Sequence, residues 1–179
     1  MIGELELLGI VGDRLRHAGI DYMLTGSFAL AFYATPRMTR DIDLVVAVAD
    51  RDVDILVSAF APDFYIDRDD VRQAIRAARM FNLMHLDSGI KVDLIVRKDD
   101  PYRIAEFERR RAIRIGDIDS FIVSREDLIL SKLVWGRDSG SDLQRRDVRL
   151  LADGPLDREY LDRWAARLGV ADMLAEVLP

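Results

Sequence analysis

The segment covering residues 22–48 places the strongest constraint on how this chain can fold. An apolar run at residues 20–24 leads through Gly26 into a second short apolar stretch and then a basic loop. The segment continues through Asp41 and Asp43 into another apolar run. Short apolar runs bounded by turn residues are typical of buried strands. The segment therefore predicts a strand, a turn, a helix, a loop and a second strand.

The acidic pair at the head of the second strand carries the first chemical signal. Because side chains on a strand alternate between faces, Asp41 and Asp43 project to one side, while Ile42 and Leu44 point to a core. Two carboxylates on one face repel each other and tend to raise one pKa. A cation between them relieves that repulsion, and acidic oxygens at this spacing suit Mg²⁺. Taken alone, the pair also fits two solvated aspartates on an edge strand.

Gly26 and Ser27 fall where the first strand ends and the helix starts. A glycine allows the backbone to approach a ligand closely. The free N–H groups and the positive dipole end of a helix start attract phosphate. The Ser27 hydroxyl either caps the helix or contacts a phosphate oxygen. Alone these residues indicate a turn and a cap, but beside Asp41 and Asp43 they indicate a phosphate cradle facing a metal site.

A third acid is expected on a neighbouring strand, and Asp93 is the only acid in the apolar run 90–96. Strands this apolar are usually interior. A buried carboxylate is costly there unless it is paired or binds a metal. The alternative places Asp93 at a strand end, hydrogen-bonded and partly solvated. Together with the first two motifs, Asp93 predicts a third metal ligand.

These motifs resemble those of the nucleotidyltransferase superfamily, which has the fold of DNA polymerase beta. The closer resemblance is to the toxin-like branch typified by the AbiEii abortive-infection proteins, with Gly-Gly-Thr-x-Ala-Leu followed by Arg-x-Ser-x-Asp-x-Asp. Residues 25–30 and 37–43 occupy those places. The departures are Thr25 for the first Gly, Ser27 for Thr and Thr39 for Ser.

The resemblance implies an α/β (α+β) fold, in which a nucleotidyltransferase-type mixed β-sheet is flanked by helices and followed by a C-terminal helical cap. We expect a catalytic core at residues 1–123 and a helical subdomain packed on it at residues 124–179. In the toxin-like branch the helical part supplies a Lys and an Asp to the site, and Lys132 and Asp147 match that pair. Lys132 would hold a nucleotide phosphate as a point charge, and Asp147 would orient it or bind the acceptor. A lone Lys on an apolar helix also commonly extends its head to solvent.

The implied reaction moves a nucleoside monophosphate from an NTP to a hydroxyl acceptor and releases pyrophosphate. Asp41, Asp43 and Asp93 would hold two Mg²⁺ ions, with Asp93 taking the acceptor proton. As acceptor, the resemblance suggests a tRNA end, a partner protein or a small hydroxylated molecule. It also suggests a component of a toxin–antitoxin or phage-defence system with a cognate partner. The competing interpretation is a non-catalytic nucleotide- or partner-binding module. The expected catalytic residues are Asp41, Asp43, Asp93 and Lys132, and the expected nucleotide-binding residues are Gly26, Ser27, Arg37 and Asp147.

Three arginines, Arg72, Arg76 and Arg79, recur at helical spacing on a predicted helix. They form either a solvated face or a surface for nucleic-acid or triphosphate oxygens. The net charge of −6 argues against coating of nucleic acid by the whole surface, although a local basic cleft remains compatible with it. Further along, residues 121–123 predict a short edge strand, and residues 136–141 predict a flexible break between two helices.

The composition excludes several other kinds of site. The chain has no cysteine and two histidines, so disulfides, thiolate metal sites and a histidine-based zinc site are not expected. No apolar run approaches the roughly 20 residues that span a bilayer. The first residues carry Glu4 and Glu6 and lack the basic start of a signal peptide. We therefore expect a cytoplasmic protein that does not enter a membrane.

Overall fold

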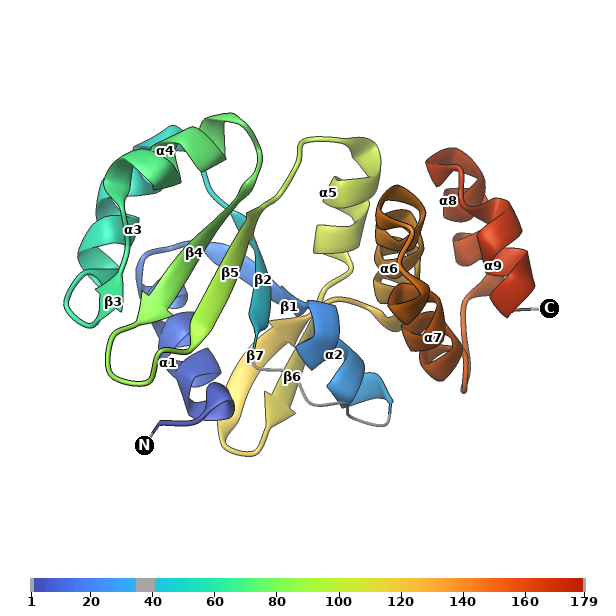
Figure 1. Cartoon of the computed structure of the whole chain (residues 1–179), viewed down its shortest axis with the longest axis horizontal. Helices are drawn as coiled ribbons and strands as arrows, with labels where there is room; N and C mark the ends of the chain where they lie inside the picture. The colour runs from blue at the N-terminus through green and yellow to red at the C-terminus, as the bar shows by residue number, and fades with distance from the viewer. Residues whose placement is uncertain (1, 35–40, 179) are drawn as a thin grey trace.

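The computed structural model describes residues 2–34 and 41–178. In that part of the chain, seven strands form one mixed sheet in the order β3-β4-β5-β2-β1-β7-β6 (Figure 1). The predicted mixed α/β class with flanking helices is confirmed. The strands are β1 (Asp21–Thr25), β2 (Ile42–Ala47), β3 (Phe64–Tyr65), β4 (Met80–His85), β5 (Lys91–Val96), β6 (Arg111–Ile115) and β7 (Ile118–Ile122).

Two groups of helices lie at opposite sides of the sheet. In Figure 1, α3 and α4 lie at the end of the sheet that carries β3 and β4, and α5 to α9 gather at the other side. A short 3₁₀ turn, η1 (Asp50–Asp52), leads into α3. The helices are α1 (Glu4–His17), α2 (Gly26–Tyr33), α3 (Val53–Phe60), α4 (Arg68–Arg76), α5 (Pro101–Glu108), α6 (Arg125–Ser139), α7 (Asp142–Leu151), α8 (Arg158–Leu168) and α9 (Ala171–Val177).

The strand register brings four side chains into one row across the middle of the sheet. Thr25 on β1 pairs with Asp43 on β2, Asp43 pairs with Asp93 on β5, and Asp93 pairs with Asn82 on β4. Register partners on adjacent strands point to the same face. The two acids that the sequence places 50 residues apart therefore become direct neighbours.

The opposite face of the same strands forms the core. Ile42, Leu44 and Val46 on β2 are fully buried, as are Val92 and Leu94 on β5. Burying an aliphatic side chain of this size contributes about 1.5–3 kcal/mol. Since a one-residue slip would exchange the two faces, this apolar set holds Asp43 and Asp93 on the other side.

The C-terminal helices are joined to the sheet part through a buried carboxylate. Asp127 in α6 is completely buried and accepts hydrogen bonds from Ser124, from Arg109 before α6, and from the Tyr160 hydroxyl in α8. The Tyr160 bond is 2.6 Å long and the Arg109 bond is 3.1 Å. One side chain thus ties together three parts of the chain, while the division at residues 123 and 124 remains a prediction.

Three local expectations are wrong. The strand predicted at 121–123 begins at Ile118 and lies inside the sheet, parallel to β1, so β6 forms the edge. The helix α6 continues through Gly136 to Ser139 without a break. A Cβ at Gly136 would lie 3.3 Å from Cβ of Gln144 in α7, so glycine at this position allows the two helices to pack closely.

The predicted arginine face is also incorrect, since α4 ends at Arg76 and Arg79 lies beyond it. The chain leaves the helix through Ala78, whose φ of 47° is incompatible with a continued helix. Arg76 pairs with Asp50 at 2.9 Å. Arg72 lies 3.4 Å from Asp69. No helix among the described residues is both long enough and apolar enough to cross a membrane.

Candidate active site

The corner between β1 and α2 forms one wall of the site. Gly26 has φ +64°, in the left-handed region that glycine adopts without strain. A Cβ at this position would overlap the Asp43 carboxylate, so the backbone approaches Asp43 more closely than any other residue type would allow. The N-cap position is held by Thr25, whose side chain makes no capping hydrogen bond, and Ser27 lies inside the first turn. The predicted helix start beside the acids is present, with Thr25 in place of Ser27 as the cap.

Asp43 lies in an environment that disfavours its charged form. Its pKa is raised to about 6, chiefly because it is buried, and further because the negative charges of Asp93 and Asp41 lie nearby. The positive charge of Lys132 and a hydrogen bond from the Ser27 backbone partly oppose this rise. The charges of Asp41 and Asp93 thus both act on Asp43.

Asp93 on the neighbouring strand is 6% exposed and has two unlike oxygens. Its Oδ2 accepts a hydrogen bond from Lys91 Nζ at 3.0 Å. Its Oδ1 is buried and has no hydrogen-bond partner among the described atoms. Buried carboxylate oxygens are rarely left without a partner, because desolvation is then uncompensated. An unpaired, buried oxygen in register with a second carboxylate fits a cation ligand.

The side chains as placed do not form a finished metal cage. Within residues 2–34 and 41–178, no three acidic, histidine or cysteine side chains are grouped so that they could hold a metal ion. Asp41 is exposed at the start of β2, and Lys91 occupies one oxygen of Asp93. The chemistry of the donors nevertheless fits Mg²⁺, because all of them are carboxylate oxygens.

Lys91 is a site residue that the sequence motifs do not indicate. The hydrogen bond to Asp93 is the main cause that raises its pKa, and the charges of Asp93, Asp41 and Asp43 add to the effect against a smaller opposing effect of burial. Its ammonium group is therefore attracted electrostatically by all three acids. Strand alternation is the sequence signal that places Lys91 beside Asp93, since residues 91 and 93 lie on the same face of one strand.

Lys132 and Asp147 form a buried ion pair on the helical side of the site. Lys132 Nζ lies 2.6 Å from Asp147 Oδ2 and donates a second hydrogen bond of 3.2 Å to Gln144 Oε1. Lys132 is 4% exposed and Asp147 is 1% exposed, so the solvent-extended alternative for Lys132 is wrong. The lysine charge lowers the pKa of Asp43, so Lys132 lies close enough to act on that carboxylate. Arg37 lies outside the described residues.

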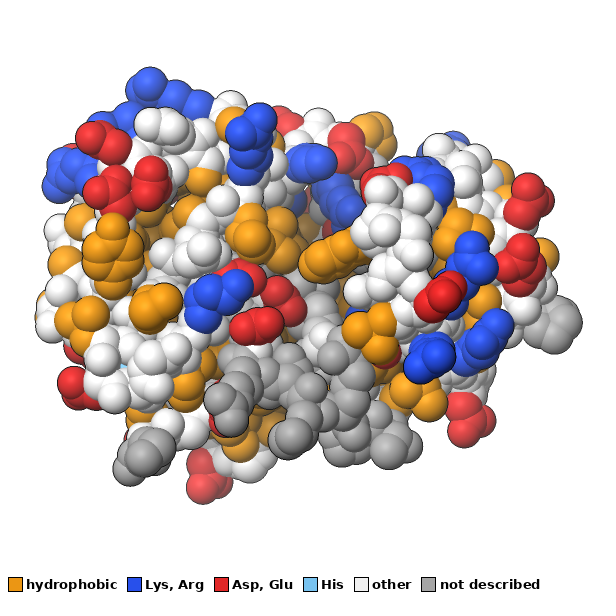
Figure 2. All heavy atoms as spheres, in the orientation of Figure 1, with side chains coloured by type: hydrophobic (Ala, Val, Ile, Leu, Met, Phe, Trp, Pro, Cys, Tyr) orange, Lys and Arg blue, Asp and Glu red, His pale blue; other side chains and the backbone are white. Residues whose placement is uncertain are grey.

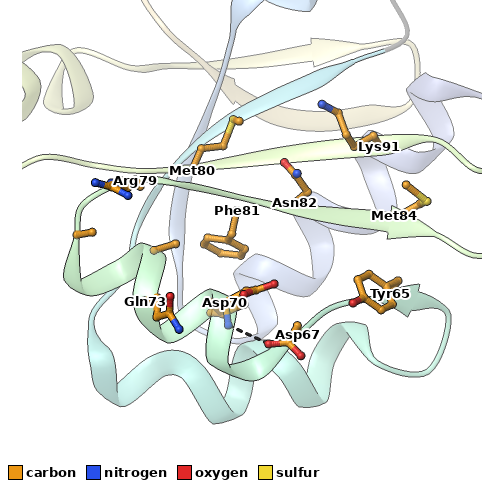
Figure 3. Close-up of a pocket in the computed structure, with 13 residues that line it drawn as sticks. Tyr65, Asp67, Asp70, Gln73, Arg79, Met80, Phe81, Asn82, Met84 and Lys91 are labelled. Carbon is orange, nitrogen blue, oxygen red and sulfur yellow. Dashed lines mark hydrogen bonds between the residues drawn. The ribbon is translucent and has the colours of Figure 1, made fainter.

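A cavity of about 540 Å³ opens beside Lys91 and Asn82, between β4 and α4 (Figure 3). In that view Met80, Asn82 and Lys91 rise on one side of the strands, while Phe81 points toward α4. Figure 2 shows acidic side chains clustered beside a basic one near the middle of this face of the molecule, with apolar side chains around them. The cavity adjoins the site through Lys91 and Asn82, which are the neighbours of Asp93.

Neither the protein-family models nor the curated proteins give a match to this chain. Solved structures do match. One is an antigenic nucleotidyltransferase-like protein from Paracoccidioides brasiliensis, with TM-score 0.60 and 19% identity over 98% of this chain and 92% of that chain. A second is the antibiotic-resistance factor ANT(2″)-Ia, with TM-score 0.60 and 14% identity over 95% of this chain and 92% of that one.

A third similar structure is the lincosamide antibiotic adenylyltransferase LnuA, with TM-score 0.52 and 15% identity over 85% of this chain and 98% of that chain. Identities this low show a shared fold and nothing finer. The chain therefore has the fold of nucleotidyltransferase-like proteins. The narrower resemblance to the AbiEii branch rests on the motifs alone.

Proposed function

We propose that this chain is a Mg²⁺-dependent nucleotidyltransferase, which moves a nucleoside monophosphate from an NTP to a hydroxyl acceptor and releases pyrophosphate. The register pairing of Asp43 with Asp93, beside the start of α2, is the observation that carries the proposal. It places two acids and a phosphate-attracting helix start at one point of the sheet. The fold shared with nucleotidyltransferase-like proteins supports the same reaction class.

Asp41, Asp43 and Asp93 would hold two Mg²⁺ ions, and the unpaired Oδ1 of Asp93 supports this role. When bound, the ions would neutralise triphosphate charge and lower the pKa of the acceptor hydroxyl. Asp93 would take the proton from that hydroxyl. Mutual repulsion between Asp43 and its acidic neighbours is the physical reason for a cation here.

Gly26 and Ser27 would bind the phosphates through backbone N–H groups at the start of α2. The Ser27 backbone already donates a hydrogen bond to Asp43, so this part of the helix faces the acids. Lys132 would contact a nucleotide phosphate, held in place by Asp147 at 2.6 Å. Arg37, which precedes Asp41 in the sequence, would add a further phosphate contact.

Three classes of acceptor follow from the proposal: a tRNA end, a side chain of a partner protein, and a small hydroxylated molecule. A structure of ANT(2″)-Ia contains adenylyl-2″-tobramycin, and LnuA was solved with lincomycin, which supports the small-molecule class. The motif resemblance to the AbiEii branch supports a toxin–antitoxin or phage-defence role with a cognate partner in the cytoplasm.

The test incubates purified protein and Mg²⁺ with each of four labelled NTPs, in the presence of total RNA, cell lysate or a panel of aminoglycosides and lincosamides. Transfer of label with pyrophosphate release is expected in one of these mixtures. Asp43→Asn and a chelator should each abolish it. Equal silence of the wild type and Asp43→Asn, with nucleotide binding that does not need Mg²⁺, would instead favour the non-catalytic binding module.

A further inference from the structure

Lys91 is a charged side chain on the open sheet face, and the proposed reaction gives it no role. Its ammonium lies 3.0 Å from Asp93 Oδ2, and the two residues stand on the same face of β5. It is attracted by Asp41 and Asp43 as well as by Asp93. A single positive charge thus lies where three negative charges converge.

Lys91 lies against one of the carboxylates that would hold a metal. A Mg²⁺ ion bound to Asp93 would bring two positive charges close to this ammonium group, and charges of the same sign repel each other. Asp93 Oδ1, by contrast, has no partner among the described atoms. Lys91 therefore satisfies half of Asp93 and leaves the other half open.

The surroundings of Lys91 provide room for a second position. Its side chain is 36% exposed, and it lines the cavity of about 540 Å³ between β4 and α4. Asp67, just before α4, and Asp70, within α4, line the same cavity. A flexible four-carbon stem allows the ammonium to leave Asp93 and remain solvated near other acids.

We infer that Lys91 is a built-in counter-ion of the acidic cluster, which holds Asp93 in the metal-free protein and moves into the adjoining cavity when Mg²⁺ binds. This inference rests on the proposed function, because it takes the carboxylates to be the Mg²⁺ ligands. Lys91 is then a positioning residue that competes with the ion. Lys91 weakens the binding of Mg²⁺ in the absence of nucleotide. It also keeps Asp93 oriented when no ion is bound.

The first test is titration calorimetry of Mg²⁺ into metal-free protein, without nucleotide or acceptor. Lys91→Met should tighten Mg²⁺ binding by about threefold to tenfold, a modest factor because the ion pair is partly exposed. Lys98→Met is the matched control, since it removes the same charge at an exposed residue beyond the end of β5. Equal affinities of Lys91→Met and Lys98→Met would overturn the inference.

The second test follows the lysine itself in the wild type. The chain has three lysines, Lys91, Lys98 and Lys132, so amine acylation at each can be followed separately by mass spectrometry. Mg²⁺ should increase the acylation rate of Lys91 and leave that of Lys98 unchanged. Asp43→Asn should suppress the increase. A Lys91 rate that Mg²⁺ leaves unchanged, in protein shown by calorimetry to bind the ion, would contradict the movement.

The outcomes separate this inference from the proposed function. If neither the wild type nor Lys91→Met binds Mg²⁺, the metal site and the proposed enzyme both fail. If both bind Mg²⁺ with the same affinity, the metal site stands and the role of Lys91 fails. Tighter binding by Lys91→Met alone supports the inference, whichever acceptor the protein uses.

Discussion

Asp43 and Asp93 are register partners on the parallel strands β2 and β5, and their carboxylates lie on one face of the sheet. Burial and the charges of Asp93 and Asp41 raise the pKa of Asp43 to about 6. The metal-free protein therefore holds a carboxylate that is more easily protonated when the chain is folded. The pH dependence of stability and of metal binding follows from this relationship.

Asp43→Asn is expected to stabilise the metal-free protein at pH 8. The pKa of Asp43 is about 6 in the folded chain, against an ordinary aspartate value of 3.8, so the ionised form destabilises the fold above pH 6. This cost shrinks as the pH falls from 6 and is gone below about 3.8. The full shift corresponds to an upper value of about 3 kcal/mol, and we expect a gain of about 1–3 kcal/mol.

Urea unfolding in the presence of a chelator, at pH 8 and pH 4, measures this difference. Asp87→Asn, in the exposed turn between β4 and β5, is the control and should change little at either pH. If Asp43→Asn were as stable as the wild type at pH 8, the burial and repulsion assigned to Asp43 would be wrong.

Mg²⁺ binding is expected to weaken in acid because a proton competes with the ion for Asp43. Below a pKa of about 6 the apparent affinity should fall by up to about tenfold per pH unit, and above pH 7 it should level off. The rise in melting temperature with added Mg²⁺, recorded from pH 5 to pH 8, gives this profile. An affinity that does not change between pH 5 and pH 8 would remove Asp43 from the ligand set.

Gly26→Ala is expected to damage the site more than an equivalent change elsewhere. Gly26 and Gly116 have similar positive φ angles, +64° and +61°. A Cβ at Gly116 meets nothing within 4 Å, whereas one at Gly26 overlaps the Asp43 carboxylate. Gly116→Ala should therefore show only the backbone penalty of about 1–2 kcal/mol, and Gly26→Ala should lose further stability and Mg²⁺ affinity. Equal losses in unfolding and calorimetry experiments would mean that the close approach at Gly26 is unimportant.

The shared face of Asp43 and Asp93 follows from strand alternation, which is a local rule. Each of these two acids sits in an apolar run that fixes which side faces the core. The sequence does not state which strands become neighbours, so the Asn82 position beside Asp93 emerged only from the register. Lys91 was overlooked for another reason, since its ion pair joins two residues on one strand and has no motif of its own.

The wrong expectations arose where tertiary packing overrides a local signal. Gly136 reads as a helix breaker, yet it stays helical because α7 packs against it. Arg79 matches the helical spacing of Arg72 and Arg76, but the chain has already left the helix at Ala78. The local pattern predicts an edge strand at residues 121–123, whereas β7 pairs with β1 through Leu24 and Ile122, which are far apart in the sequence.

The helical cap is expected to unfold together with the sheet part. Asp127 in α6 is completely buried and receives the Tyr160 hydroxyl from α8 and the Arg109 guanidinium from outside the cap. Tyr160→Phe should cost about 1–3 kcal/mol because it withdraws a hydroxyl donor from a buried carboxylate. Tyr65→Phe is the control, since Tyr65 is 64% exposed.

Fluorescence of Trp135 and Trp164 reports the cap, and circular dichroism reports the whole chain. Both signals should follow one transition, with the same midpoint in each variant. Separate midpoints would show that residues 124–179 fold as an independent unit.

The Lys132–Asp147 pair allows stability to be separated from nucleotide binding. Both side chains are buried, and their charged atoms lie 2.6 Å apart. Lys132→Met or Asp147→Leu alone removes one charge and leaves the other buried, which should cost about 3–5 kcal/mol. The double variant Lys132→Met/Asp147→Leu replaces the pair with apolar side chains and should recover most of that loss.

If Lys132 binds a nucleotide phosphate, the recovered double variant should still bind NTP at least tenfold more weakly than the wild type, as measured by calorimetry with Mg²⁺. A double variant that regained both stability and NTP affinity would show that the pair only supports the fold. A double variant that regained neither would mean that Lys132 and Asp147 each make further buried contacts that the apolar side chains do not replace.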